Sequence, residues 1–194
     1  MKTYSSLDLL GNEYEKSKRK NSIFQWIECW LDIRVTEAEL TVTIPHSVYL
    51  RTRLICDYIR SVYDSPMNTS HFINILYVDF IHRHMKKHNP RKMYDELTKY
   101  DFSLGEVMIN DPMNNKKYTY QNYGSTEIEI DYTVSKKNIE RGEIILAELD
   151  ELLGIHFTVE ELLSKLWINF IQSFSDGNNE KAIDKLLKIA AKNF

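Results

Sequence analysis

The chain carries the same pattern of apolar and polar positions twice, at an offset of 90 residues and without a gap. Residues 39–81 align with residues 129–171 from end to end. Each segment predicts one short strand followed by two helices, and each has too little apolar surface to fold alone. The two copies are therefore expected to bury each other's apolar faces. The few residues of the first copy that recur with the same type include Glu39, Thr43, Arg51, Ile55, Phe80 and Ile81.

In the first copy, residues 39–44 alternate between polar and apolar side chains, which is the period of a half-buried strand. Pro45 lacks the amide that the next ladder position would use, so the strand is expected to stop there. A helix is predicted from about residue 47 to 63, and a second helix is capped at residues 68–70 and ends before Pro90. The apolar stripes of the two helices are expected to be Leu50, Leu54, Ile55, Tyr58, Ile59 and Val62, and then Phe72, Ile73, Leu76, Tyr77, Phe80 and Ile81.

The second copy repeats these elements in the same order. Residues 129–134 alternate as a strand, and residues 138–153 form a helix that Gly154 ends in the left-handed conformation. Thr158 and Glu161 have the spacing of a capping box, which predicts the start of the next helix. The apolar stripe of that helix is expected to be Leu162, Leu163, Leu166, Trp167, Phe170 and Ile171.

A strand, a helix, a tight turn with a polar cap and a second helix together resemble the ribbon-helix-helix family, the Arc/MetJ/CopG group of DNA-binding proteins. In that family two copies pair, and their strands form an antiparallel ribbon that enters the major groove of double-stranded DNA. The resemblance therefore implies a mainly α fold with a small antiparallel β-ribbon. The chain would be a tandem ribbon-helix-helix pseudo-dimer with a β-hairpin insert between its two units.

The resemblance also assigns site residues. Outward side chains of the ribbon would face the bases, and the amides at the start of each second helix would hold a phosphate. This ribbon offers threonines and three carboxylates where the family usually has Arg, Lys, Asn or Gln. The Glu160–Glu161 pair argues against a phosphate beside the second unit. The base-facing residues would be Glu39, Thr41, Thr43, Glu129, Asp131 and Thr133, and the phosphate-contacting residues Arg51, Arg53, Asn68, Thr69, Ser70, Lys136, Lys137 and Thr158.

The parts outside the repeat divide the chain further. A helical N-terminal extension is expected over residues 1–37, the two units over 38–89 and 127–176, an insert over 90–126, and a C-terminal amphipathic helix over 177–194. The insert predicts a short helix over residues 93–100 and a hairpin of residues 105–110 with 116–120. The C-terminal helix either packs on the domain or mediates self-association. A basic run in the extension, which is either a solvated face or an arm that touches DNA, contains Lys16, Lys18, Arg19 and Lys20.

Composition and charge limit the possible functions. The net charge is −3, but residues 127–175 alone contain four basic and ten acidic residues. No apolar run is long enough to span a membrane, and Cys29 and Cys56 are expected to be buried thiols of a cytoplasmic protein. His82, His84 and His88 have no cysteine or carboxylate nearby to complete a metal site, so we expect no metal. No cofactor loop or nucleophile motif is present, and an enzyme is not expected.

The sequence thus favours a sequence-specific double-stranded DNA-binding protein. Its role would be that of a transcriptional repressor or an accessory factor of plasmid or phage replication, partition or transfer, and this choice comes from the resemblance alone. The alternative is a protein-interaction module, such as an inhibitor or adaptor, that keeps the fold and does not bind DNA. The acidic balance of the second unit supports that alternative. A third interpretation is an assembly protein that uses its C-terminal helix.

Overall fold

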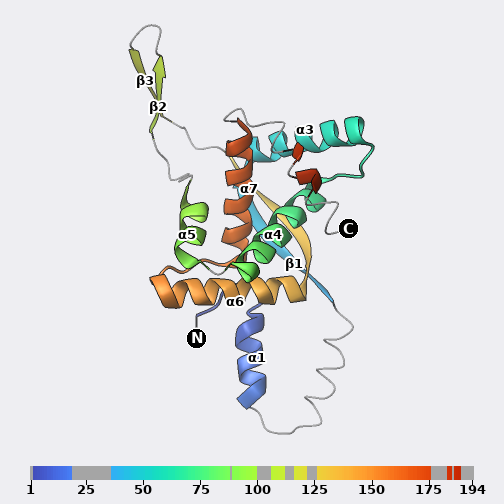
Figure 1. Ribbon diagram of the computed structural model, residues 1–194, viewed down its shortest axis with the longest axis vertical. Coiled ribbons are helices and arrows are strands. Elements are labelled where there is room, and N and C mark those ends of the chain that lie inside the picture. Colours follow the sequence, from blue (N-terminus) through green and yellow to red (C-terminus); the bar gives the residue numbers. More distant parts are fainter. Residues whose placement is uncertain are drawn as a thin grey trace.

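The computed structural model describes residues 2–18, 36–87, 89–99, 106–111, 116–121, 126–175, 183–184 and 186–188. Over these residues the protein is mostly helical, with two small antiparallel two-stranded sheets (Figure 1). The elements are α1 (Leu9–Lys18), β1 (Glu37–Pro45), α3 (His46–Tyr63), α4 (Thr69–Lys86), α5 (Pro90–Thr98), β2 (Glu106–Asp111), β3 (Lys116–Gln121), β4 (Glu127–Ser135), α6 (Lys136–Leu153) and α7 (Val159–Ser175).

The helices and strands of the two copies begin at equivalent residues under the 90-residue offset. The ends of β1 and α3 coincide with those of β4 and α6 under this offset, and α4 and α7 start at equivalent residues. Asp64 and Gly154 are also equivalent, and both end a helix in the left-handed conformation, with φ values of 48° and 69°. The two predicted strand–helix–helix segments are therefore present, with strands slightly longer than predicted.

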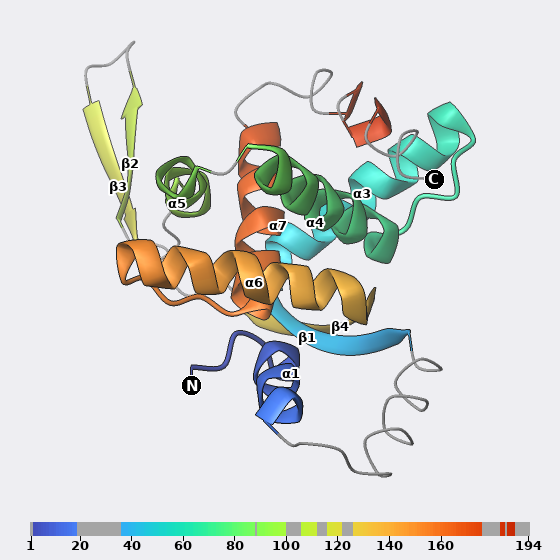
Figure 2. The same ribbon diagram turned by 60° about the horizontal axis from the view of Figure 1, so that its bottom comes forward.

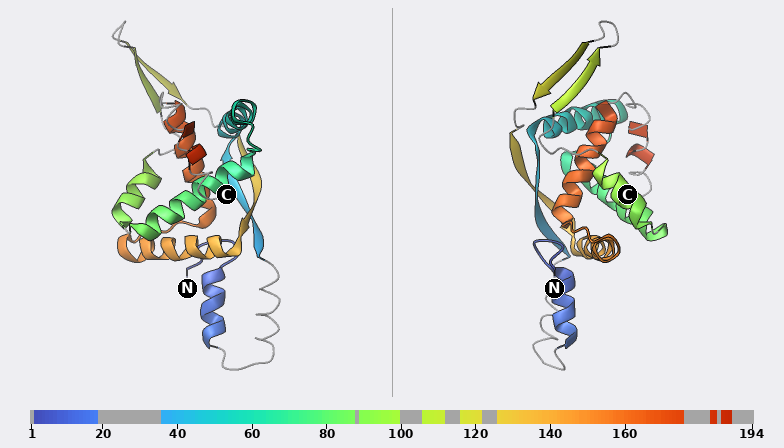
Figure 3. Two further views of the ribbon diagram at one scale, coloured as in Figure 1. Left: turned by 45° about the vertical axis from the view of Figure 1, so that its right-hand side comes forward. Right: turned by 90° about the vertical axis from the view of Figure 1, so that its left-hand side faces the viewer.

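The strands of the two copies pair with each other. β1 lies antiparallel to β4, and the register places Thr41 opposite Asp131, its own equivalent in the repeat. The pairing is therefore symmetric about this residue pair, and the β-ribbon lies along one side of the helices (Figure 3). The predicted pairing of residues 39–44 with residues 129–134 is confirmed. The ribbon side chains buried against the helices are Leu40, Val42, Ile44, Tyr132 and Val134.

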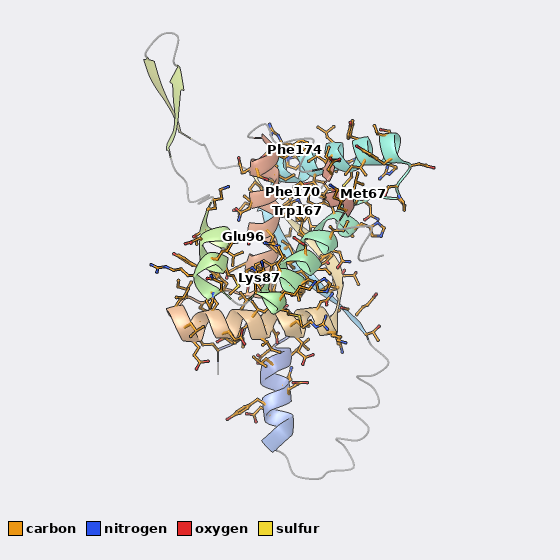
Figure 4. All side chains as sticks on the ribbon, viewed as in Figure 1. Met67, Lys87, Glu96, Trp167, Phe170 and Phe174 are labelled. Carbon is orange, nitrogen blue, oxygen red and sulfur yellow. The ribbon has the colours of Figure 1, made fainter. Side chains whose placement is uncertain are left out.

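Each second helix places an aromatic side chain on the first helix of the other copy. Trp167 on α7 is fully buried, and its indole Nε1–H donates to Thr52 Oγ1 of α3 at 2.7 Å (Figure 4). Tyr77 on α4, the equivalent of Trp167, donates its hydroxyl to the Asn138 carbonyl of α6 at 2.9 Å. Gly142, the equivalent of Thr52, lies under the Tyr77 ring, where a methyl group would overlap the Tyr77 hydroxyl. Through these two contacts each copy packs against the first helix of the other.

The buried face of the first helix differs from the prediction. Leu54 is 69% exposed, and Leu50, Tyr58 and Val62 are also exposed. The face turned to the core instead includes the polar Thr52, because Trp167 needs a hydrogen-bond acceptor there. Of the predicted stripe, Ile55 and Ile59 are buried as expected, and the other four residues are exposed. The residues that α3 buries are Val48, Thr52, Ile55, Cys56 and Ile59, and on α6 the equivalents of Leu54 and Val62, Ile144 and Leu152, are exposed as well.

The insert begins with α5, which packs against α6 and α7. Asn89 caps α5 by accepting from the Lys92 amide at 3.0 Å. Pro90, which follows the end of α4, is therefore also the first residue of α5. Arg83 of α4 connects α4 with α5, since it donates to Asp79 of its own helix at 2.9 Å and to Glu96 of α5 at 2.8 Å. Burial would raise the pKa of Glu96, but its interactions with His84 and Arg83 outweigh burial and lower the pKa to about 2.

Two further predictions concern the ends of the insert and of the chain. β2 and β3 form the predicted hairpin, which projects away from the helices (Figures 1 and 3). Of the predicted C-terminal helix, residues 183–184 and 186–188 are described, and Ile183 and Leu186 are buried in the core. At these positions the helix packs on the domain, and self-association stays a prediction. Cys56 is a buried free thiol, as expected, and Cys29 lies outside the described residues.

Candidate functional site

The largest predicted site is the outward face of the β-ribbon. Along residues 37–43 of β1 and 127–133 of β4, the odd-numbered side chains are exposed to solvent and alternate with buried or half-buried ones. The structure thus brings all six predicted base-facing residues together on one surface. We call this surface the acidic ribbon face, and it consists of Glu37, Glu39, Thr41, Thr43, Glu127, Glu129, Asp131 and Thr133.

The acidic ribbon face carries five carboxylates and no basic side chain. The register explains how so much negative charge is tolerated, because it places each carboxylate opposite a neutral residue. Glu39 faces Thr133, Glu129 faces Thr43, and Thr41 Oγ1 donates to Asp131 Oδ1 at 3.0 Å. Like charges directly opposite each other in a sheet would destabilise it. The arrangement therefore keeps a strongly negative surface on a stable ribbon.

The predicted phosphate-contacting residues lie beside the ribbon rather than on it. Lys136 and Lys137 begin α6 directly after β4, and Arg51 and Arg53 are exposed on the first turns of α3. At the start of α4, Asn68 accepts from the His71 amide at 2.8 Å, which confirms the predicted cap. Thr69 and Ser70, which form the first turn of α4, are half-buried and exposed, respectively.

The start of α7 is occupied differently from the start of α4. Thr158 and Glu161 form the predicted capping box, with N···O distances of 2.9 and 3.2 Å. The next amide, that of Val159, donates to the carbonyl of Tyr4 at 2.7 Å, and Glu160 accepts from the Ser6 amide at 2.8 Å. The N-terminal segment of the chain therefore lies where the resemblance would place a phosphate on the second unit.

Two carboxylates of α6 hold this N-terminal segment, and the sequence interpretation missed both. Asp150 accepts from Lys2 Nζ at 2.8 Å and also from Tyr4 and His156. The hydrogen bond from Lys2 lowers the pKa of Asp150, against the effect of burial. Asp150 therefore connects parts of the chain that are far apart in the sequence, as Glu160 does through the Ser6 amide.

Glu143 is the second of these carboxylates and is fully buried. It accepts from the amides of Leu9 and Leu10 at 3.0 and 2.6 Å and from the Ser5 hydroxyl, so it caps α1. α1 consequently packs on α6, on the side away from α4 (Figures 1 and 2). The sequence contains a signal for this role, because Glu143 is a charged residue among the apolar residues that α6 buries.

The basic run and the histidines add little to the site. Lys16 and Lys18 belong to α1, but their side chains, like Arg19 and Lys20 entirely, lie outside the described residues. His84 is buried against Phe80, with its Nε2 3.8 Å from Glu96 Oε2. Within the described ranges, no cluster of His, Cys, Asp and Glu residues is arranged to hold a metal ion.

Comparison of the chain with protein-family models, with curated proteins and with solved structures found no match. Among the helices that the structure describes, none has both the length and the apolar character needed to cross a bilayer.

Proposed function

We propose that this chain is a tandem ribbon-helix-helix pseudo-dimer that acts as a protein-interaction module, an inhibitor or adaptor that binds a positively charged partner through its acidic ribbon face. The observation that carries this proposal is the charge of that face. Five exposed carboxylates lie on one two-stranded ribbon without a basic side chain among them. Among the described residues, no ion pair neutralises Glu37, Glu39, Glu127 or Glu129.

The same charge disfavours insertion of the ribbon into a DNA groove. Phosphates line both sides of the major groove, and proteins gain most of their affinity for DNA by neutralising them with Lys and Arg. A carboxylate can accept a hydrogen bond from cytosine N4, but it gains nothing from the phosphates around it. A ribbon with five carboxylates would therefore be repelled before any base contact forms.

Sequence-specific binding of double-stranded DNA is the second candidate, and the geometry of the first unit favours it. The ribbon is exposed and symmetric about Thr41 and Asp131, and Arg51 and Arg53 lie on the helix that follows β1. The start of α4 is capped by Asn68, and among the described residues no backbone hydrogen bond joins it to residues 2–18. A repressor, or a plasmid or phage accessory factor, would use the first unit for most of its phosphate contacts.

Binding measured against salt separates the two candidates. We expect the chain to bind an oligolysine peptide at about 50 mM salt, and to show no affinity for a pool of duplex DNA fragments under the same conditions. The double variant Glu129→Gln/Asp131→Asn should bind the peptide about tenfold more weakly, because it removes two charges from the contact surface. The matched control is Asp95→Asn/Glu151→Gln, which removes two exposed carboxylates away from the ribbon and should bind like the unaltered chain.

Duplex binding that falls steeply with salt would overturn the proposal and establish the second candidate. In that case the Glu129→Gln/Asp131→Asn variant should bind DNA more tightly, since repulsion from the phosphates is reduced. Charge reversal at Arg51 and Arg53 should then abolish DNA binding. Equal peptide affinity of the ribbon variant and its control would also contradict the proposal, because the acidic ribbon face would not be the contact surface.

A further inference from the structure

The outer edge of β4 presents backbone groups that point away from β1. The ladder continues past both strand ends, where the His46 amide donates to the Thr126 carbonyl and the Lys136 amide to the Thr36 carbonyl. Because hydrogen-bonded pairs alternate in an antiparallel ladder, the even-numbered residues bond across the ribbon. The amides and carbonyls of the odd-numbered residues Glu129, Asp131 and Thr133 therefore point to the outer edge.

The two edges of the ribbon are not equivalent. α7 packs along β1 much more extensively than α4 packs along β4. Ser164 on α7 donates its hydroxyl to the Thr43 carbonyl at 2.8 Å, which satisfies an outward carbonyl of β1. Its equivalent on α4, Asn74, accepts from the Tyr132 hydroxyl instead. Within the described part of the chain, no side chain bonds to the Thr133 carbonyl, so β4 is the open edge.

Burial on the inner side of the ribbon agrees with this difference. Leu40 on β1 is 1% exposed, whereas its equivalent on β4, Ile130, is only half-buried, and so is Ile128. A strand placed beside β4 would cover these two isoleucines. Its other face would lie next to Glu129 and Asp131.

We propose that the outer edge of β4 accepts an extended basic segment of a partner protein as a third, antiparallel strand. Strand addition obtains affinity from main-chain hydrogen bonds and specificity from alternate side chains. Here the alternation requires Lys or Arg on the side of Asp131 and small apolar residues on the side of Ile130. This inference rests on the proposed function and names the conformation and pattern of the partner.

The charge of the edge selects this occupant over a second copy of the chain. Two β4 edges brought together antiparallel would place the row of Glu127, Glu129 and Asp131 beside the same row of the other copy. Charged side chains on an edge strand prevent pairing of that kind between identical molecules. A basic segment turns the same charges into attraction. The acidic residues therefore exclude self-pairing and admit a basic strand.

Peptides of equal charge test strand addition separately from charge attraction. An alternating peptide, Lys-Val repeated four times, is compared by calorimetry with its isomer, Lys-Lys-Val-Val repeated twice. In an antiparallel strand the residues opposite Asp131 share its face, so the lysine amides would bond to β4. We expect the alternating peptide to bind about tenfold more tightly than its isomer. N-methylation of its lysine amides should remove this advantage, and N-methylation of its valine amides should not.

Variants of residue 133 make the matching test on the protein. Thr133→Pro removes an outward amide and places a ring at the edge without taking a bond from the β1 ladder. The Thr133→Pro variant should bind both peptides with the affinity that the unaltered chain has for the isomer. The Thr133→Ala variant should keep the preference for the alternating peptide. Equal binding of the two peptides by the unaltered chain would overturn strand addition and leave the proposed function standing. Failure of both peptides to bind would overturn both.

Discussion

Replacing Trp167 with alanine is expected to lower the free energy of unfolding by about 3–5 kcal/mol. The side chain is fully buried, and it packs on Phe72 of α4 as well as donating to Thr52 of α3. Its removal leaves a cavity at the contact between the two copies and leaves the Thr52 hydroxyl without its donor. Urea denaturation followed by circular dichroism measures the change.

The control for this variant is Leu54→Ala on α3. Leu54 is equally apolar in the sequence pattern but 69% exposed, so its truncation should change the free energy of unfolding by less than about 0.5 kcal/mol. A single cooperative transition is expected for both variants, because the copies share one core. Two separate transitions, or a Trp167→Ala variant as stable as the unaltered chain, would show that the copies fold independently.

Gly142→Ala is expected to destabilise the protein by about 1–3 kcal/mol, although alanine is the better helix former. The added methyl group would overlap the Tyr77 hydroxyl and lie 3.2 Å from Tyr77 Cζ. The buried tyrosine cannot move aside, because its hydroxyl is bonded to the Asn138 carbonyl. Thermal or urea unfolding of the single variant tests this expectation.

A double-mutant cycle assigns the loss to the contact between α4 and α6. Tyr77→Phe removes the overlapping hydroxyl, so the variant Gly142→Ala/Tyr77→Phe should be more stable than the sum of the single changes by at least about 0.5 kcal/mol. Tyr58→Phe, on the exposed face of α3, should be additive with Gly142→Ala. Additivity in the Tyr77 cycle would contradict the interlocked arrangement.

The periodicity of the sequence predicted the elements of this fold well, for a physical reason. Alternation with period two identified β1 and β4, and the 90-residue offset predicted that they pair. Local chemistry identified the helix starts, since Asn68 and Thr158 cap through hydrogen bonds within three residues. Such features depend on neighbours in the chain, so one sequence suffices to find them.

The features that the sequence did not predict depend on distant partners. Thr52 is a core residue only because Trp167 approaches it, and Glu143 is buried only because α1 places its first amides there. The occupation of the α7 start by residues 4–6 has no local signature. The sequence predicted six residues of the acidic ribbon face. Glu37 and Glu127 also belong to it, because β1 and β4 are longer than predicted.

NMR distinguishes pairing of the two copies within one chain, through the β-ribbon, from pairing between chains. Opposite residues in a non-hydrogen-bonded antiparallel pair have their Cα atoms only about 4.5 Å apart. We predict strong Hα–Hα NOEs between Thr41 and Asp131, between Glu39 and Thr133, and between Thr43 and Glu129. In a mixture of labelled and unlabelled chains, filtered spectra should show none of them between molecules. Their absence, or their appearance only between molecules, would show that β1 and β4 do not pair within one chain.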